Sequence, residues 1–246
     1  MKKLSIIFML LMITILLAAN EITADKILSK MDDNRISDSQ TATIKMTVHG
    51  RRNSRTLVMK SYSRGNDDSF TEYLEPVREK GTKMLKLNDN LWIYSPSTDR
   101  IIKISGHMLR QSVMGSDLSY EDLMTETEMQ EDYTATILGD EIFNERTCWK
   151  LELLAKSLDL AYSKRLIWVD KIRFIALKEE LYSLSGTLLK ESIIHEVFQV
   201  EKRWYPKRLT YRDVLKKGKG TEIFFEKIQF NQNIPASTFS KAALRK

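Results

Sequence analysis

Apolar and polar residues alternate with a period of two along most of this chain. In residues 41–48, Ile44, Met46 and Val48 alternate with threonine and lysine, which is typical of a strand with one solvated face. Similar segments follow one another closely and are separated by turn residues such as glycine, asparagine and proline. The pattern predicts strands at residues 41–48, 55–62, 69–74, 82–87, 90–94, 100–104, 133–138, 146–155, 163–169, 174–181, 188–198, 208–215 and 221–230.

Two segments depart from this alternation. Residues 21–31 place apolar side chains at helical spacing and predict a short amphipathic helix that ends at Asp32-Asp33-Asn34. Between residues 105 and 130 the strand pattern stops, and Gly115-Ser116-Asp117 supplies residues that favour turns and helix caps. We therefore expect an insertion with a short helix that crosses the sheet.

The order of these segments constrains the fold class. Many sequential strands with hairpin-length connections predict a single large antiparallel sheet, and such a sheet must curl or be covered to bury its apolar face. The two helical segments are too short to cover it completely. The sequence therefore predicts a mainly β protein, with a large curved sheet and a hydrophobic cavity of the kind found in lipid-binding barrels.

The first nineteen residues are typical of a secretory signal peptide. Lys2 and Lys3 precede an apolar run at residues 4–17, and Ala18-Ala19 provides small residues for cleavage after Ala19. The apolar run is shorter than the roughly 20 residues of a spanning helix, although an uncleaved membrane anchor is the alternative. We predict a soluble mature protein outside the cytoplasm, with one domain at residues 20–246; the family resemblance described below implies that this compartment is the periplasm.

Composition adds little to this picture. The formal net charge is +6, and loss of the two lysines of the signal peptide leaves +4. This excess fits transient contact with an anionic membrane surface, for example through the basic turns at Arg51-Arg52 and 216–219, but solvated turns explain it equally well. A nucleic-acid partner is disfavoured by the compartment. With Cys148 as the only cysteine, no internal disulfide can form.

Several short motifs occur in a specific order along the chain. They are Glu75-Pro76, Lys80-Gly81-Thr82-Lys83-Met84-Leu85, Leu91-Trp92-Ile93-Tyr94-Ser95-Pro96, residues 114–123, and Phe230-Asn231 followed by Ile234-Pro235 and Phe239. In this order the chain resembles the LolA-like family of outer membrane lipoprotein-sorting proteins, in particular the branch associated with RND-type lipid exporters.

The resemblance implies an incomplete, half-open antiparallel β-barrel with short helices as a lid over a hydrophobic cavity. It also implies a carrier that binds acyl chains of a lipoprotein or lipid and moves them between the inner and outer membranes, without catalysis and without a cofactor. The expected partners are the acyl chains themselves, an inner-membrane RND-type or ABC transporter, and the membrane surface. We expect a monomer.

Methionine and aromatic residues are the candidates for the cavity wall. An acyl chain offers only apolar surface, and methionine adapts to irregular ligands while aromatic rings supply large apolar walls. Each of these residues could equally be an ordinary core residue. The candidates are Met46, Leu57, Met59, Met84, Trp92, Tyr94, Ile102, Trp149, Leu151 and Trp168.

The insertion supplies the candidate lid. Its residues are Gly115, Ser116, Asp117, Leu118, Tyr120, Asp122 and Leu123. Ser119 and Asp122 have the spacing of a capping box, so the polar residues also have a purely structural interpretation. As a lid, the segment would open to admit cargo, which requires a weakly held element.

Two other classes of function are the alternatives. A hydrolase would need a nucleophile and a base, but the chain lacks a G-x-S-x-G motif, and His107 is the only histidine placed where a catalytic triad could form. Metal-binding spacings are absent as well, so no metal site is predicted. A module that binds a protein partner at a sheet edge, without lipid, is the second alternative, and a fully packed interior would favour it.

Overall fold

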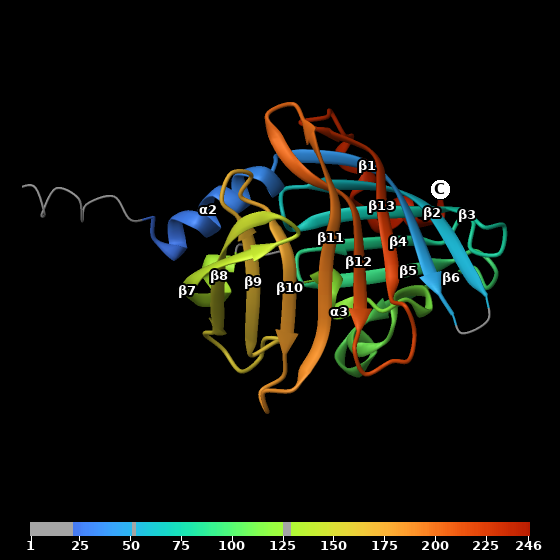
Figure 1. Cartoon of the computed structure of the whole chain (residues 1–246). Helices are drawn as coiled ribbons and strands as arrows, with labels where there is room; N and C mark the ends of the chain where they lie inside the picture. Colours follow the sequence, from blue (N-terminus) through green and yellow to red (C-terminus); the bar gives the residue numbers. More distant parts are fainter. Residues whose placement is uncertain (1–21, 51–52, 125–128) are drawn as a thin grey trace, which may run out of the picture.

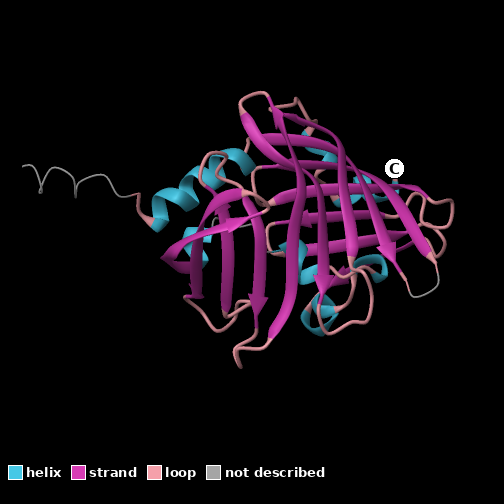
Figure 2. Cartoon of the chain, viewed as in Figure 1, coloured by secondary structure: helices cyan, strands magenta, loops and turns pink. Residues whose placement is uncertain are grey.

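The computed structural model describes residues 22–50, 53–124 and 129–246. The predicted signal peptide and the Arg51-Arg52 turn lie outside the described residues. One antiparallel sheet of 13 strands dominates the fold (Figures 1 and 2). Its strands are β1 (Ser39–His49), β2 (Ser54–Arg64), β3 (Asp68–Glu75), β4 (Lys83–Leu87), β5 (Asn90–Ser95), β6 (Arg100–Ile104), β7 (Tyr133–Phe143), β8 (Arg146–Ala155), β9 (Lys164–Asp170), β10 (Ala176–Tyr182), β11 (Leu188–Val200), β12 (Arg203–Asp213) and β13 (Thr221–Phe230).

The sheet is an open barrel. The strand order is β6-β5-β4-β3-β2-β1-β13-β12-β11-β10-β9-β8-β7, so β6 and β7 form the two edges although they are consecutive in the sequence. The insertion that joins them carries 3-10 turns η2 (Gly106–Arg110) and η3 (Val113–Gly115) and helices α3 (Tyr120–Met124) and α4 (Met129–Asp132). The predicted mainly β, half-open barrel with few short helices is confirmed.

The N-terminal helix is longer than predicted. Helix α2 (Ala24–Arg35) begins after Thr23, whose hydroxyl oxygen accepts a hydrogen bond from the Lys26 amide at 3.2 Å. Its predicted end at Asp32-Asp33-Asn34 is wrong, because Asp32 pairs with Arg35 at 3.0 Å and supports one more turn. The buried side chains of α2 pack against strands β7, β8 and β9.

Strand β12 also begins earlier than predicted. Its first residue is Arg203, and Pro206 lies within the strand rather than before it. Pro206 pairs with Val197 directly beside a register shift, where Glu196 faces Arg208. A bulge tolerates proline because the ladder is already interrupted there.

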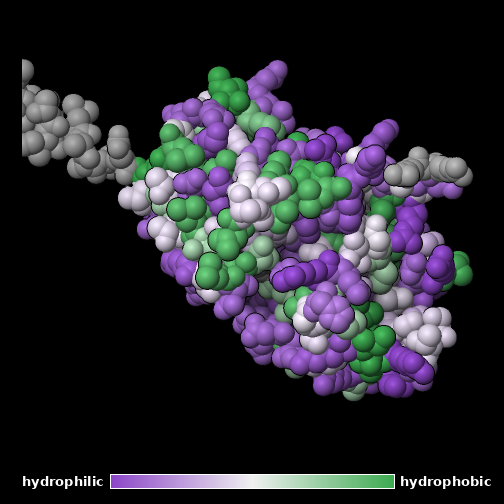
Figure 3. Space-filling model, turned by 90° about the horizontal axis from the view of Figure 1, so that it is seen from below, coloured by the Kyte–Doolittle hydropathy of each residue, from purple (hydrophilic) through white to green (hydrophobic). Residues whose placement is uncertain are grey.

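Short segments cover both faces of the sheet. The insertion packs on Met46, Leu57, Met59, Met84 and Leu91, whereas the C-terminal η4 (Ala236–Thr238) and η5 (Lys241–Arg245) region covers the opposite face of β3–β5 through Phe239 and Leu244. Exposed large apolar side chains, among them Val77, Ile142, Ile172 and Leu184, are scattered. Figure 3 shows hydrophobic and hydrophilic residues interspersed on one face. None of the helices in the described ranges is both long and apolar enough to cross a membrane.

Candidate ligand-binding cavity

A cavity of about 300 Å³ lies between the concave side of β1–β5 and the insertion. Successive side chains of a strand point to opposite faces, so only every second residue of each strand reaches it. The inner end is lined by apolar and aromatic side chains, including Met46, Met59, Tyr73, Met84, Leu118 and Leu123. This end can accept an alkyl chain and offers it no charged group.

The other end of the cavity is polar. Strand register places Gln40 opposite Ser63, Ser63 opposite Ser69, and Ser69 opposite Lys86, which makes one continuous polar row across β1–β4. All four residues line the cavity. The row ends near the exposed Gly65 in the turn between β2 and β3, so the polar end meets the surface there.

Two cations and no carboxylates belong to the described lining of this cavity. Lys86 is 5% exposed, and its Nζ donates to the carbonyl oxygens of Asn66 at 3.0 Å and Met124 at 3.5 Å. Arg35, at the end of α2, pairs with Asp32 at 3.0 Å. Because Asp32 compensates Arg35, Lys86 is the cation of the polar end that has no carboxylate partner among the described residues.

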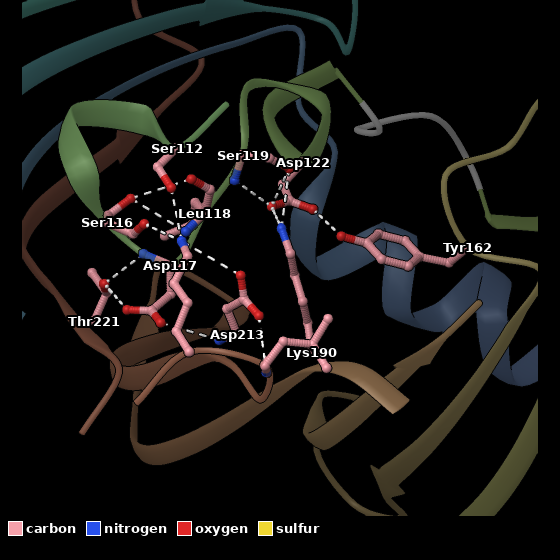
Figure 4. Close-up of polar contacts among 12 residues, drawn as sticks. Ser112, Ser116, Asp117, Leu118, Ser119, Asp122, Tyr162, Lys190, Asp213 and Thr221 are labelled. Atoms are coloured by element: carbon pink, nitrogen blue, oxygen red, sulfur yellow. Dashed lines mark hydrogen bonds and ion pairs between the residues drawn. The ribbon is translucent and has the colours of Figure 1, made fainter. Parts of the chain in front are cut away.

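A buried ion pair fixes the second half of the insertion to the sheet (Figure 4). Asp122 of α3 binds the Nζ of Lys190 on β11, and the same nitrogen donates to Ser119 Oγ at 3.1 Å. Tyr162 donates to the other Asp122 oxygen at 2.5 Å, and the Ser119 amide donates to Asp122 at 2.6 Å. The predicted Ser119–Asp122 capping relationship is present, and Asp122 does more than cap.

Electrostatics of this cluster favour the ionised carboxylate. Burial alone would raise the pKa of Asp122, but the Lys190 ammonium and the hydrogen bonds from Lys190, Tyr162 and Ser119 outweigh it and lower the pKa below its ordinary value. Burial, together with the Asp122 charge, raises the pKa of Tyr162, so its hydroxyl stays protonated as a donor.

The first half of the insertion is held by a second polar cluster. The fully buried Thr221 at the start of β13 donates to Asp117 Oδ2 at 2.7 Å and accepts from the Asp117 amide at 2.9 Å. The Asp213 amide donates to Asp117 Oδ1 at 3.2 Å. Lys216 reaches Ser112 Oγ at 2.7 Å and the Ser116 carbonyl at 3.0 Å. Figure 4 shows both clusters side by side.

A tight turn lies within the first half of the insertion. Gly115 has φ of +68°, and an added Cβ would lie 3.2 Å from Arg55 Nη2, which itself donates to the Met114 carbonyl. The positive φ is the reason that glycine suits this turn, because the flexible end of Arg55 could move away from an added Cβ. Leu118 and Leu123 line the cavity and Tyr120 packs in the adjoining core, so the predicted lid segment forms part of the cavity wall. Its opening stays a prediction.

The predicted cavity residues separate into groups. Met46, Met59 and Met84 line the cavity, and Leu57 is buried in the core cluster beside it. The structure does not bring the other six to it. Trp92 and Tyr94 face the C-terminal segment, Ile102 is 46% exposed, Trp149 and Leu151 lie under α2, and Trp168 packs with Cys148 on the other face.

The physical reason is that two different segments cover the concave side. Helix α2 fills the β7–β9 half, so Leu151 and Trp149 meet helix side chains instead of a cavity. Sequence reasoning also missed Lys86 and the serines in register with it. The available signal was a polar residue at an inward position of an alternating strand, next to Met84.

The histidines form no catalytic arrangement within the described ranges. His49 Nδ1 contacts Ser54 Oγ at 2.9 Å and His195 Nε2 contacts Thr210 Oγ1 at 2.8 Å, both at the exposed surface and without a carboxylate behind the ring. His107 lies in η2. The part of the chain that the structure describes also holds no group of three or more histidine, cysteine, aspartate or glutamate residues able to bind a metal ion.

The open antiparallel barrel with a cavity under a helical insertion defines the class of proteins with a LolA-like fold. The fold is similar to an outer membrane lipoprotein-sorting protein domain from Vibrio parahaemolyticus, with 26% identity over 89% of this chain and 98% of that one and a TM-score of 0.78. The fold is also similar to a LolA superfamily protein from Nitrosomonas europaea, with 27% identity over 91% of this chain and 100% of that one and a TM-score of 0.76.

Further comparisons agree with this class. A DUF1329 family protein from Desulfovibrio piger has the same fold, with a TM-score of 0.82, 23% identity and coverage of 89% of this chain and 96% of that one. No curated protein matches the chain significantly. A family model with the description "-like: Uncharacterized protein" matches residues 65–246. The chain belongs to the family that this model describes, and its fold is that of the LolA superfamily.

Proposed function

We propose that this protein is a periplasmic carrier that binds an acyl chain of a lipid or lipoprotein and moves it between the inner and outer membranes. The observation that supports the proposal is the cavity between β1–β5 and the insertion, apolar at its inner end and open beside Gly65. A fully packed interior would have favoured a protein-binding module instead.

The lining suits a ligand that varies in shape. Burial of an alkyl chain contributes roughly 0.8 kcal/mol per methylene, so a carrier needs apolar area rather than directed hydrogen bonds. Met46, Met59 and Met84 contribute flexible, polarisable side chains to that area. Such a wall can close around chains of different length or unsaturation and release them again.

The carrier would receive its cargo from an inner-membrane transporter of the RND or ABC type. We infer that the acyl chain passes through the polar end, because both halves of the insertion are held to β11–β13 by buried polar contacts. The basic turn at 216–219 would contribute only transient contact with anionic headgroups, since Lys216 already binds Ser112 and Ser116.

Native mass spectrometry of the mature protein, purified gently from a periplasmic extract, tests the proposal. The expected result is a mass above that of the chain, which organic extraction resolves into an acyl-containing molecule. A clean apo mass, combined with failure to take up a fluorescent fatty acid, would contradict the carrier and favour the protein-binding module.

A further inference from the structure

The cavity has a charge pattern that a purely apolar cargo does not explain. We propose that it selects a single-chain lipid with an anionic head, a carboxylate or a phosphate, and that Lys86 binds this head while the alkyl chain occupies the methionine-lined end. This inference rests on the carrier function proposed above and names the class of ligand that the cavity takes.

The first argument is the environment of Lys86. Lys86 is 5% exposed, yet both of its hydrogen-bond partners among the described residues are neutral carbonyl oxygens, those of Asn66 and Met124. A buried ammonium group is costly unless an anion compensates it. Lys190, the most buried lysine that pairs with a carboxylate in the described ranges, is 9% exposed, so Lys86 is more enclosed than any of these paired lysines.

The second argument is the composition of the wall around it. Among the described lining residues, Arg35 and Lys86 carry charge and none is acidic. Gln40, Ser63 and Ser69 continue the polar row from Lys86 across the neighbouring strands. Hydroxyl and amide donors beside a cation are the groups that bind a carboxylate or phosphate well, because charge-assisted hydrogen bonds are the strong ones.

The third argument is the order of the residues along the strands. Two positions from Ser63 and Ser69 lie Ser61 and Thr71, whose hydroxyls are 3.1 Å apart, and two positions further lie Met59 and Tyr73. Polarity therefore falls steadily from the surface to the inner end. An amphiphile inserted tail first would match this gradient with its head beside Lys86.

The size of the cavity limits the number of chains. At about 300 Å³ it stands at the lower end of ligand pockets, which span roughly 300–1,000 Å³. One alkyl chain with a small head is the ligand that this volume favours. The acylated end of a lipoprotein carries several chains and no anionic head beside them, so the proposal separates free lipid from lipoprotein cargo.

Displacement of a bound fluorescent fatty-acid probe by matched lipids tests the inference. The first pair is palmitate and its neutral methyl ester; the second is palmitoyl lysophosphatidate and monopalmitoylglycerol, which differ only in the phosphate. In the wild-type protein we expect the anionic member of at least one pair to bind about tenfold more tightly, the equivalent of about 1.4 kcal/mol. The pair that shows the larger preference identifies carboxylate or phosphate as the head.

Variants on one strand provide the control. Lys86→Met should remove the preference and leave binding of the neutral lipids intact, and Lys86→Arg should retain it. Lys83→Met is the matched control: Lys83 is 8% exposed on the same strand but three residues away, on the other face. It should keep the preference of the wild-type protein.

The possible failures are distinguishable. Equal binding of both members of each pair by the wild-type protein would overturn the inference and leave the carrier function standing. A preference that survives in Lys86→Met would overturn the assignment to Lys86. Binding of none of the lipids would contradict the carrier function itself. The wild-type comparison needs no variant, so it decides even if Lys86→Met does not fold.

Discussion

Asp122 in the insertion and Lys190 on β11 form a buried ion pair between residues 68 positions apart in the sequence. Their side chains are 6% and 11% exposed, and Ser119 and Tyr162 complete the hydrogen bonding of the carboxylate. The pair holds α3 against the sheet at the inner side of the cavity. The pair therefore ties the predicted lid segment to the sheet at this point, and opening of that segment would have to break it.

Removal of one partner of this pair should be strongly destabilising. Lys190→Met leaves the Asp122 carboxylate buried without its cation, and such losses cost about 3–5 kcal/mol of unfolding free energy. The double variant Lys190→Met/Asp122→Leu should lose less than the sum of the single variants. Urea unfolding measures each value.

The surface pair of Lys45 and Glu226 provides the control. Its atoms are 2.9 Å apart, but both side chains are more than 40% exposed, and Lys45→Met should cost no more than about 1 kcal/mol. An equal loss for Lys45→Met and Lys190→Met would contradict the role of burial.

The fold was largely predictable from the sequence, and the cavity only partly so. Each predicted strand is present, because alternation of apolar and polar residues reports directly on a half-buried strand. The exceptions are local. Pro206 is typical of a strand boundary, but the register shift beside Val197 accommodates it, and the residues around Pro206 do not show which strand it will pair with.

The cavity depends on which segment covers each part of the sheet, and one strand's pattern does not contain that information. Leu151 and Met84 both face the concave side, but α2 covers Leu151, whereas the insertion packs beside Met84. The Asp122–Lys190 pair also could not be predicted from the sequence, because the residues around Asp122 and Lys190 do not indicate that the two side chains meet. The strands can therefore be predicted from the periodicity of the sequence, but the position of the cavity depends on tertiary packing.

Stability should fall as the pH drops through the acidic range. Burial alone would raise the pKa of both Asp122 and Asp170. The charge of Lys190 instead lowers the pKa of Asp122. Hydrogen bonds from Arg146 and from two backbone amides lower the pKa of Asp170. A carboxyl group whose pKa is lower in the folded than in the unfolded state stabilises the fold at any pH above its unfolded pKa, which is about 3.9 for aspartate. This stabilisation is lost as the pH falls from the unfolded pKa toward the folded pKa.

Chemical unfolding at pH 7 and pH 3 measures this effect. We expect a clear loss of unfolding free energy at pH 3 for the wild-type protein and a smaller loss for Asp122→Asn, which has already lost the titrating group. An identical pH dependence in both proteins would show that Asp122 does not contribute.

Release of the other end of the insertion should alter its motion without unfolding the barrel. Thr221→Val keeps the shape of a fully buried side chain and removes the two hydrogen bonds to Asp117. We expect faster amide hydrogen exchange at residues 115–118 and unchanged exchange in β7–β9. Unchanged exchange at 115–118 would mean that Asp117 does not hold the segment. Uptake of a fatty-acid probe should remain as fast as in the wild-type protein if the ligand passes beside Gly65.

Filling the cavity should abolish binding. Ser61 lines it midway between the polar and apolar ends, so Ser61→Trp places an indole where the ligand lies. Lys60→Trp is the matched control, because Lys60 is the preceding, exposed residue of the same strand and points to the other face. Titration with a fluorescent fatty acid should show lost affinity in the first variant only. Equal affinities would contradict the assignment of the cavity as the ligand site.

Trp92 distinguishes the structure from the prediction made on sequence alone. The sequence places it in the cavity wall, whereas its indole lies 4.4 Å from Lys241 Nζ and packs with the C-terminal segment on the opposite face. Trp92→Ala should therefore lower the unfolding free energy, by about 2 kcal/mol for a large side chain that is partly buried, and leave fatty-acid affinity unchanged. Met59→Ala, in the cavity wall, should change that affinity. If Trp92→Ala weakens binding as strongly as Met59→Ala while the barrel stays folded, Trp92 belongs to the ligand site after all.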